Sequence, residues 1–424
     1  MKVLVVGGGG REHAIAWKLS KENNVEKIYC APGNAGIAKV AQCVNISDSD
    51  IENLVKFAKE NNIDLTVVGP EVPLVNGIVD EFEKEGLKIF GPNKECSTFE
   101  GSKSFSKDFM IRHNIPTAKY KEYTNLDEAI SEIDSFGYPV VIKADGLAAG
   151  KGVVIPENRE DAINTLREIM SDKKFGSAGE KIVVEEFLSG IETSILAFVD
   201  NDTIVPMVSA KDHKKVYNFE KGPNTGGMGT FSPSEIYTDE LSKEISEKVL
   251  NRTLQGFKKD NLNYKGVLFI GLMITEDGPK VLEYNVRFGD PETQSVLFRL
   301  ETDLHKIMEA ILDNKLKDIE INYKKEEAVC VMLTSGGYPE DYEKGKVITG
   351  LEDLDEDIVV FHSGTKMLDG NLVTNGGRVI GITTSAGSVE EAAKKVYKNI
   401  EKINFEGMHY RTDIGMKFCE ELSL

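Results

Sequence analysis

Residues 1 to about 95 alternate short apolar runs with amphipathic stretches, and this pattern restricts the fold more than any other in the chain. Apolar runs typical of buried strands lie at residues 2–6, 27–30, 65–68 and 88–90. Helical patterns lie between them, at residues 12–20, 51–60 and 75–85. Because strands that alternate with helices form parallel sheets covered on both faces, we predict an N-terminal doubly wound α/β domain.

Glycine-rich segments follow the predicted strands, at residues 7–13, 31–36 and 69–71. Ligands of doubly wound sheets bind beyond the carboxyl ends of the strands. One such segment alone is as well explained by an ordinary turn, whereas three at one sheet edge favour a phosphate or sugar-phosphate site. The first segment also enters a predicted helix, whose N-terminus attracts anions, and Arg11 adds a positive charge.

The first glycine segment does not fit the dinucleotide fingerprint G-x-G-x-x-G. Counted from Gly7 the third glycine position holds Glu12, and counted from Gly8 it holds His13. The second predicted strand also ends without the acidic residue that binds the ribose hydroxyls of such cofactors. A monophosphate ligand therefore fits this edge better than a dinucleotide.

A further glycine loop, residues 146–152, lies between apolar runs at residues 138–145 and 153–155. It is not a P-loop, because three residues rather than four separate Gly146 from Gly150, and Lys151 is followed by Gly152. A glycine loop between two strands is typical of a lid whose backbone N–H groups cover phosphates. Lys143 ends the preceding strand as a lone cation, and buried lysines need partners, so an anionic ligand is expected there.

Two flanking segments are compatible with the same ligand but also have ordinary explanations. Lys103 and Lys107 lie one turn apart on a predicted helix, and a solvated helix face remains an alternative for Lys107. In residues 181–192 an apolar strand runs into acidic residues. Its backbone could pair with an adenine edge and Glu192 could hold ribose hydroxyls, although an ordinary strand end is at least as good an explanation.

The segment from Gly266 to Gln294 carries the strongest chemical signal. An apolar strand at residues 266–274 is followed by a turn and a second strand at 280–287. Side chains alternate along a strand, so Leu282, Tyr284 and Val286 are expected in a core, and the opposite face carries Glu283, Asn285 and Arg287. Carboxylate and amide oxygens suit Mg²⁺ beside a charged substrate group, and a solvated sheet face is the alternative.

The stretch between these segments contains Lys211 to Lys215 and a glycine run at residues 222–229. The run is too polar for a core strand and cannot be helix interior, so we interpret it as a substrate loop. His213 lies among lysines, and a surface or anion-contacting role is expected rather than metal ligation.

Composition excludes several classes of protein. The net charge of −19 argues against non-specific nucleic-acid binding. The longest apolar stretch, residues 267–274, is too short for a membrane span. The first strand begins at Lys2 without a signal peptide before it, and the five cysteines are not at zinc or redox spacings, so we expect a cytoplasmic protein, acting as a monomer.

These motifs, in this order, resemble those of the ATP-grasp superfamily and, more narrowly, of its phosphoribosylamine–glycine ligase family. The matching segments are residues 9–14, 31–36, 143–152, 222–229 and 287–294, and together they span nearly the whole chain. The resemblance implies an α/β and α+β multidomain fold. We expect an N-terminal substrate-phosphate domain at 1–105, an ATP-grasp region at 106–325 with a lid at about 121–190 and a remainder at 191–325, and a small mixed β domain at 326–424.

The resemblance also implies a reaction. Glycine would be joined to 5-phosphoribosylamine through a glycyl phosphate, with ATP consumed and Mg²⁺ or Mn²⁺ required, in the second step of purine synthesis. By analogy, ATP would be bound by Lys103, Lys143, Ala149, Gly150, Lys151, Gly152, Glu185, Glu186, Leu188 and Glu192, and the metal by Glu283 and Asn285. Substrates would contact Gly9, Gly10, Arg11, Asn34, Glu71, Asp212, Gly226, Gly227, Met228, Arg287 and Asp290, with Arg287, Asp212 and Lys143 catalytic.

One departure and several alternatives accompany this interpretation. Many relatives place a carboxylate on the strand before the Glu-x-Asn pair, and residues 266–274 contain none, which puts the complete metal shell in doubt. Another ATP-grasp ligase or carboxylase of purine metabolism would share the nucleotide site but not the 222–229 and 287–294 loops. A nicotinamide dehydrogenase is disfavoured by the failed fingerprint, and magnesium-dependent ATP turnover would exclude a non-catalytic nucleotide-binding module.

Overall fold

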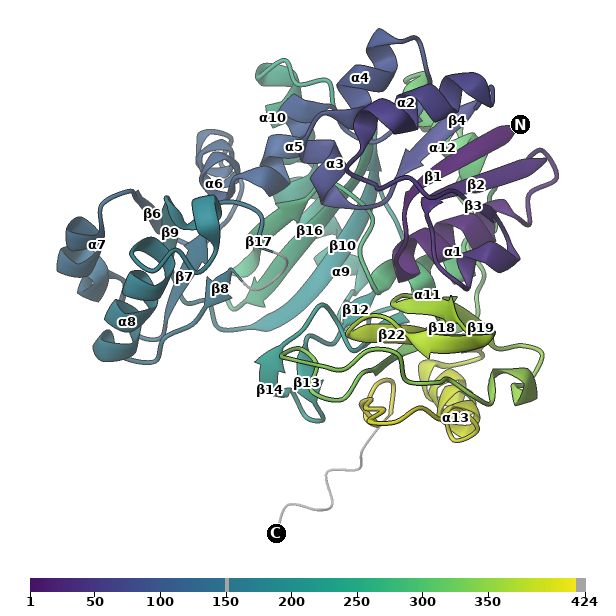
Figure 1. Cartoon of the computed structure of the whole chain (residues 1–424). Helices are drawn as coiled ribbons and strands as arrows, with labels where there is room; N and C mark the ends of the chain where they lie inside the picture. The colour runs from purple at the N-terminus through teal and green to yellow at the C-terminus, as the bar shows by residue number, and fades with distance from the viewer. Residues whose placement is uncertain (149–151, 417–424) are drawn as a thin grey trace.

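The computed structural model describes residues 1–148 and 152–416, and its N-terminal unit contains a parallel sheet (Figure 1). The strands are β1 (Lys2–Gly7), β2 (Lys27–Pro32), β3 (Gln42–Cys43), β4 (Leu65–Val68) and β5 (Ile89–Phe90), in the order β3-β2-β1-β4-β5. Val3 to Val6 are fully buried, as expected for a strand covered on both faces. The predicted doubly wound sheet is confirmed.

Helices cover both faces of this sheet. One face packs against α2 (Ile51–Glu60) and α4 (Ile78–Lys84), and the other against α1 (Gly10–Leu19) and the distant α12 (Leu304–Leu312). The helix predicted over residues 75–85 is present as α4 but begins only at Ile78, and a separate short helix, α3 (Glu71–Val75), precedes it. Gly77 separates the two helices in the left-handed region at φ 90°, a conformation that glycine adopts without strain.

The lid projects from the body of the molecule and is the left-hand unit in Figure 1. Its antiparallel sheet has the order β6-β9-β7-β8, from β6 (Tyr120–Tyr123), β7 (Val140–Ala144), β8 (Val153–Val154) and β9 (Ile182–Glu186). It carries α7 (Leu126–Glu132) and α8 (Arg159–Met170), while α5 (Lys94–Gly101) and α6 (Lys103–Arg112) lead into it. The two strands expected on either side of the glycine loop are therefore β7 and β8, which pair at one edge of the lid sheet.

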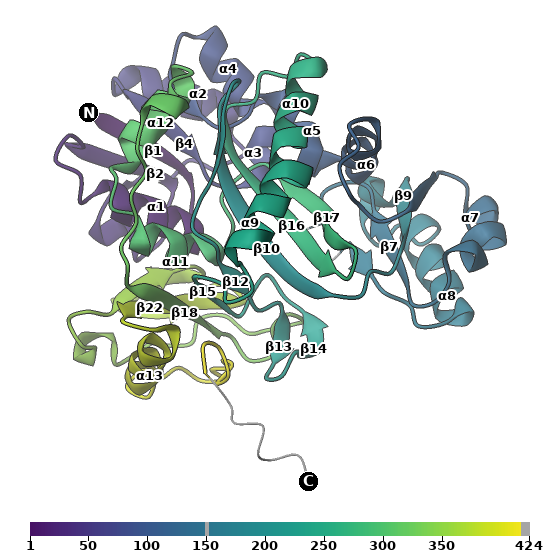
Figure 2. The same ribbon diagram turned by 180° about the vertical axis from the view of Figure 1, so that it is seen from behind.

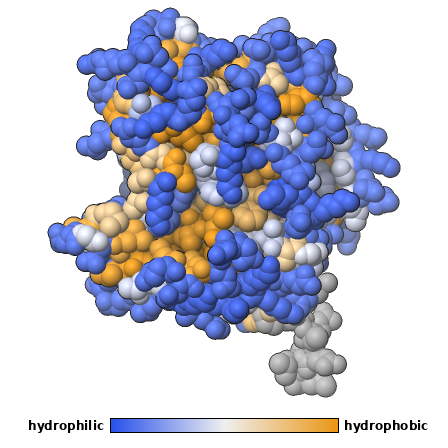
Figure 3. All heavy atoms as spheres, turned by 90° about the vertical axis from the view of Figure 1, so that its right-hand side faces the viewer, coloured by the Kyte–Doolittle hydropathy of each residue, from blue (hydrophilic) through white to orange (hydrophobic). Residues whose placement is uncertain are grey.

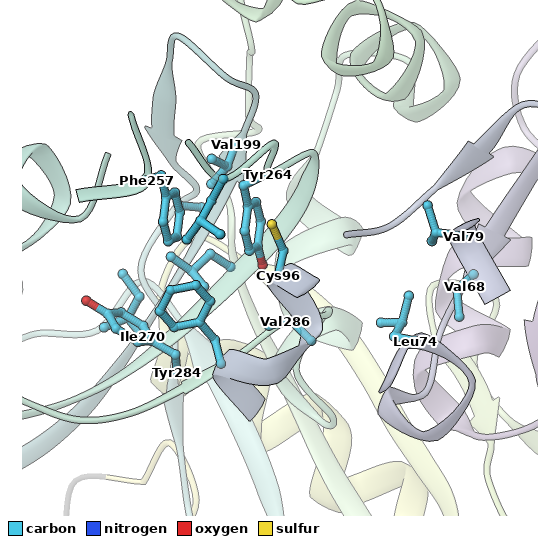
Figure 4. Packing of buried hydrophobic residues seen from close by; sticks show 14 of the residues in the cluster. Val68, Leu74, Val79, Cys96, Val199, Phe257, Tyr264, Ile270, Tyr284 and Val286 are labelled. Carbon is cyan, nitrogen blue, oxygen red and sulfur yellow. The ribbon is translucent and has the colours of Figure 1, made fainter. Parts of the chain in front are cut away.

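The central sheet contains β11 (Ile204–Pro206), β10 (Ile191–Val199), β16 (Gly266–Thr275) and β17 (Gly278–Asn285), in that order. The helices α9 (Asp239–Ile245) and α10 (Asn251–Lys259) pack against it, as seen from behind in Figure 2. In its core Phe257 stacks on Tyr264 with ring centroids 4.9 Å apart (Figure 4). The same apolar cluster includes Leu74 and Val79, so the N-terminal unit and the central sheet share one core.

A β-bulge corrects the expected facing of one residue on β17. Gly271 pairs with Glu283, but its neighbour Leu272 pairs with Val281, which leaves Leu282 as the extra residue. Val281, Tyr284 and Val286 lie in the core, whereas the expectation that Leu282 does so is wrong. The bulge leaves the Leu282 carbonyl available as an acceptor outside the ladder.

The C-terminal sheet is built from two parts of the chain. Its order is β12-β15-β18-β22-β19, from β12 (Lys211–Asp212), β15 (Gly229–Ser232), β18 (Glu327–Thr334), β19 (Val359–His362) and β22 (Arg378–Ala386). Beside it lie α11 (Glu292–Arg299), α13 (Val389–Ile400) and the hairpins β13 (Lys215–Tyr217)–β14 (Lys221–Asn224) and β20 (Thr365–Leu368)–β21 (Asn371–Thr374). Because β12 and β15 flank it, the predicted substrate loop is anchored in the C-terminal sheet.

The surface is mainly hydrophilic, with an apolar patch on the lower half of the face in Figure 3. Within residues 1–148 and 152–416, no helix combines the length and the apolar composition that a membrane span requires.

Candidate active site

Glu185 bridges two lysines between the lid sheet and α6. Its Oε1 lies 2.8 Å from Lys143 Nζ and its Oε2 lies 2.8 Å from Lys107 Nζ. All three side chains are at most 5% exposed. Lys143 also donates to the free carbonyl of Leu282 at 3.1 Å, and Lys107 donates to Thr117 Oγ1 at 2.7 Å. The cluster thus joins the lid to the central sheet with one more positive than negative charge.

Burial and pairing compete within this cluster. Burial lowers the pKa of Lys107 to about 8, although Glu185 opposes the shift. Burial raises the pKa of Glu185, but Lys143 and Lys107 together outweigh it and hold the pKa below its usual range. A further anion beside Lys107 and Lys143 would be stabilised electrostatically, which suits a phosphate chain.

The glycine loop is tied to the N-terminus of α6 through Asp145. This carboxylate accepts from the Ser104 amide at 2.6 Å and from Ser102 Oγ at 3.0 Å. Lys103 Nζ reaches the Gly146 carbonyl at 3.5 Å, and burial lowers the pKa of Lys103 while Glu283 opposes the shift. Lys103 therefore lies between the loop and the predicted metal residues. Ala149, Gly150 and Lys151 lie outside the described residues, whereas Gly152 is buried.

Glu283 and Asn285 lie on β17 and are half-buried. Burial raises the pKa of Glu283, but Lys214, Lys143 and Lys103 outweigh it and keep the carboxylate ionised, and Asn285 donates to it. An ionised carboxylate beside an amide oxygen fits Mg²⁺ or Mn²⁺. Among the described residues no three Asp, Glu, His or Cys side chains are grouped as a metal site.

Arg287 follows β17 and is held by two carboxylates. Its Nη2 lies 2.9 Å from Glu100 Oε1 and its Nε lies 3.4 Å from Glu71 Oε2. Glu100 also accepts from the Val286 amide at 2.7 Å, which fixes the backbone at the end of the strand. Burial lowers the pKa of Arg287, but Glu100 and Glu71 outweigh it and raise the net value. The guanidinium is therefore a permanent, oriented cation.

An acidic cluster lies on the other side of Glu283. Asp212 on β12 accepts from Ser194 Oγ at 3.4 Å, and Lys214 is paired with Glu192. Burial raises the pKa of Asp212, with Lys214 opposing and Glu192 adding to the shift. Burial and then Asp212 raise the pKa of Glu292 to about 8. Asp212 is half-buried and Glu292 is buried, and these two acids with raised pKa values form a site that a small cation would stabilise.

Polar side chains within the N-terminal glycine-rich segments hold the backbone of these turns in place. Glu12 accepts from the Gly9 amide at 2.6 Å and from Arg11 Nε at 2.6 Å. Arg11 Nη1 and Arg287 Nη1 both donate to the Phe288 carbonyl, at 3.2 and 3.3 Å, so the two arginines converge. Asn34 uses its amide to bridge the Gly8 and His362 carbonyls and acts as a brace between units.

The substrate loop and the loop after β17 meet at Asp290. Its carboxylate accepts from Gln294 Nε2 at 2.8 Å and pairs with Arg378 Nη2 at 3.1 Å. Burial raises the pKa of Asp290, but Arg378 and Arg11 outweigh it, so the carboxylate is ionised. Arg378 Nη1 also donates to the Gly226 carbonyl at 2.6 Å. Gly227 is in the left-handed region at φ 113°, directly against Pro291.

The structure thus brings most of the predicted residues into two adjoining regions. The junction of lid and central sheet holds Lys103, Lys143, Glu185, Glu283 and Asn285. The N-terminal sheet edge holds Arg11, Glu71, Arg287 and Asp290. Beside Glu283 lie Asp212 and Glu192. Gly10 packs against Ser363 and Gln294.

Three predicted contact residues have mainly structural partners. Met228 is buried in the core of the C-terminal sheet. Glu186 accepts from the Lys119 amide at 2.9 Å, while Leu188 is buried near the end of β9. His213 was expected either at the surface or in contact with an anion. The surface position is wrong, because His213 is only 6% exposed.

Several functional candidates escaped the sequence analysis. Lys107 is a buried partner of Glu185 rather than part of a solvated face. Glu100, Lys214 and Arg378 carried no periodic or motif signal that separates them from surface charges. The match of residues 287–294 to a family segment was the available pointer to Glu292, and none pointed to Arg378.

Comparison with known proteins covers the whole chain. Three family models match it: Phosphoribosylglycinamide synthetase, N domain, at residues 1–100; its ATP-grasp (A) domain at 101–293; and its C domain at 328–417. A phosphoribosylamine–glycine ligase from Caldanaerobacter subterraneus is 53% identical over 98% of this chain and 99% of that protein.

Solved structures agree. The crystal structure of a phosphoribosylamine–glycine ligase from Thermotoga maritima has a TM-score of 0.85 and 35% identity, covering 98% of this chain and 100% of that one. The biotin carboxylase domain of Hydrogenobacter thermophilus 2-oxoglutarate carboxylase, at 17% identity and a TM-score of 0.73 over 96% of this chain and 91% of that one, shares the fold. The chain therefore belongs to the phosphoribosylamine–glycine ligase family of ATP-grasp enzymes.

Proposed function

We propose that this protein joins glycine to 5-phosphoribosylamine, using ATP, to give glycinamide ribonucleotide, ADP and phosphate. Family membership supports the reaction. The observation that carries the assignment is the placement of two unlike charged regions side by side. A lysine cluster lies around Glu185, and Arg287 with the Asp212–Glu292 acids lies beyond Glu283. One region suits a phosphate donor and the other a zwitterionic amino acid.

The lysine cluster is proposed to hold the phosphates of ATP. A carboxylate is a poor electrophile, and its activation is a phosphoryl transfer in which positioning and charge neutralisation supply most of the catalysis. Lys103, Lys107 and Lys143 provide the positive charge, and the loop at 146–152 would exclude water. Glu283 and Asn285 would hold Mg²⁺ or Mn²⁺, which neutralises charge on the β- and γ-phosphates when bound.

Glycine is proposed to lie between Arg287 and the acidic cluster. The Arg287 guanidinium would bind the glycine carboxylate and hold the glycyl phosphate formed from it. Asp212, with Glu292 beside it, would accept hydrogen bonds from the glycine ammonium group. This placement explains why Asp212 and Glu292, two acids with raised pKa values, lie near the Lys214–Glu192 ion pair.

The amine substrate is proposed to lie at the N-terminal sheet edge, near Gly9, Arg11 and Asp290. Arg11 would neutralise the ribose phosphate, and its convergence with Arg287 on the Phe288 carbonyl brings this edge to the glycine site.

The domain limits stay a prediction, and the boundary after residue 105 falls within α6. We also propose a monomer in the cytoplasm, where the free thiols of the described cysteines, Cys30, Cys43, Cys96 and Cys330, would stay reduced.

Glycine-dependent ADP release tests the assignment. The protein is given MgATP and phosphoribosylamine, generated freshly from ribose 5-phosphate and ammonia. ADP formation that requires both glycine and the amine supports the ligase. Folded protein that turns over ATP with another carboxylate or amine, but not with this pair, would assign it to a different ATP-grasp reaction. Arg287→Ala and Glu283→Ala are expected to lower kcat by about 100-fold or more.

A further inference from the structure

Arg378 is the first residue of β22, and its side chain connects three segments that come from different parts of the chain. Its Nη1 donates to the Gly226 carbonyl at 2.6 Å and to the Asp290 carbonyl at 2.8 Å. Its Nη2 lies 3.1 Å from Asp290 Oδ2. A Cβ placed on Gly9 would lie 3.7 Å from the same Oδ2 atom, so Asp290 stands against the N-terminal glycine turn.

The C-terminal sheet holds the substrate loop at further points. Tyr338 accepts from the Gly226 amide at 2.8 Å, through its hydroxyl. The strands β12 and β15, on either side of the loop, are hydrogen-bonded into that sheet. A Cβ on Gly226 would lie 3.2 Å from both Arg378 Cζ and Tyr338 Oη, so a side chain there would press against both residues. Contacts with the C-terminal unit therefore fix the conformation of the substrate loop.

The geometry of Arg378 separates it from the phosphoryl-transfer region. Its guanidinium faces Asp290, Gly226 and Tyr338, whereas the lysines around Glu185 are bonded to the lid and to β17. Asp290 carries two fixed partners, Gln294 Nε2 and Arg378 Nη2, which set the direction of its carboxylate. A planar, forked guanidinium can orient a carboxylate and a carbonyl together, and a lysine cannot.

We propose that Arg378 is a positioning residue for the ribosylamine substrate, acting by fixing the Asp290 carboxylate and the Gly226–Gly227 backbone against the N-terminal glycine turn. This inference rests on the proposed function. It assigns the C-terminal unit a part in recognition of the sugar phosphate, and none in the binding of ATP.

Steady-state kinetics of Arg378→Ala, Arg378→Lys and Asp290→Asn test the proposal. Arg378→Ala is expected to lower kcat/KM for the amine by about 10- to 100-fold while the KM values for ATP and glycine stay within about threefold. Arg378→Lys should recover part of the loss, because it restores charge but not the fork. Lys395→Ala, which removes an exposed ion pair with Asp357 in the same unit, is the control and should behave as wild type.

A double-mutant cycle and a binding measurement make the test specific. If Arg378 acts through Asp290, adding Arg378→Ala to Asp290→Asn should cost much less than the product of the single effects. Calorimetry with ribose 5-phosphate, a stable analogue, should show weakened binding to Arg378→Ala and unchanged binding of ATP.

Three results would overturn the inference: equal loss for all three substrates, multiplicative effects in the cycle, or unchanged binding of ribose 5-phosphate. Wild-type protein without turnover on glycine and the amine would instead refute the proposed function.

Discussion

At the residue scale, the account depends on charged side chains that the fold removes from water. Lys107, Lys143 and Glu185 are each at most 5% exposed, and the Glu185 carboxylate offsets one of the two lysine charges. Hydropathy and periodicity cannot distinguish such residues from surface charges, because both look polar in the sequence. Lys143 was identified because it ends an apolar strand, whereas Lys107 lies on a helix with polar neighbours, and a solvated face was left open for it.

Glu185→Gln should destabilise the free protein strongly. Removal of the carboxylate leaves Lys107 and Lys143 buried and facing each other, and breaking a buried pair costs about 3 to 5 kcal/mol. Because the phosphates of ATP would restore a negative partner, MgATP should raise the midpoint of thermal unfolding more in the variant than in wild type. Calorimetry with and without nucleotide measures both effects.

The control is Glu168→Gln, which removes an exposed pair with Lys174 and should change stability by less than about 1 kcal/mol. A similar small effect of Glu185→Gln would contradict the importance assigned to the cluster.

Glycine binding should release a proton at pH 7. Burial and Asp212 raise the pKa of Glu292 to about 8, so the group is largely protonated in the free site below that pH. An ammonium favours the ionised carboxylate and lowers this pKa, so glycine affinity should increase as pH rises from about 6 to 8, and the release should vanish above that range. Calorimetry in buffers of different ionisation enthalpy counts the protons.

Glu292→Gln provides the check, because an amide cannot release the proton. Proton release that persists in Glu292→Gln would assign it to another group, such as Asp212.

At the scale of elements, strands and helices followed the sequence closely where periodicity was uninterrupted. The expected helix at 51–60 and strand at 65–68 coincide with α2 and β4. Deviations occurred where a single residue changes the geometry. Gly77 divides α3 from α4, and the bulge at Leu282 shifts the alternation on β17. Bulges and left-handed residues arise from pairing with distant chain segments, which a local pattern does not contain.

Gly227→Ala should distort the substrate loop. The residue has φ 113°, and a Cβ would lie 2.4 Å from Pro291 Cδ, so both strain and overlap oppose a side chain. The expected loss of stability is about 1 to 3 kcal/mol, together with a higher KM for the amine. Thermal unfolding and steady-state kinetics measure the two effects.

Gly370→Ala separates the two causes. Gly370 has φ 80° in the turn of β20–β21, and no described atom lies within 4 Å of its added Cβ. It should lose about 1 kcal/mol of stability from strain alone. If Gly227→Ala were no worse and left the kinetics unchanged, the contact with Pro291 would be unimportant.

At the scale of the whole molecule, the order of motifs predicted the architecture but not the contacts between units. The parallel sheet, the lid and the central strands were expected, since each is a local pattern. The C-terminal unit was expected as a small mixed β domain at 326–424, yet its sheet incorporates β12 and β15 and places Arg378 against Asp290. These contacts join residues far apart in sequence, and with one sequence only the fold reveals them.

Transfer of labelled oxygen tests the central claim, activation of glycine as an acyl phosphate, most directly. Glycine labelled with ¹⁸O in its carboxylate is turned over with MgATP and the amine, and the phosphate released is examined by mass spectrometry. Attack of the carboxylate on the γ-phosphate moves a carboxylate oxygen to the phosphate, so the account predicts ¹⁸O in the phosphate in proportion to the glycinamide ribonucleotide formed. Unlabelled phosphate, released at the same rate as product, would contradict it.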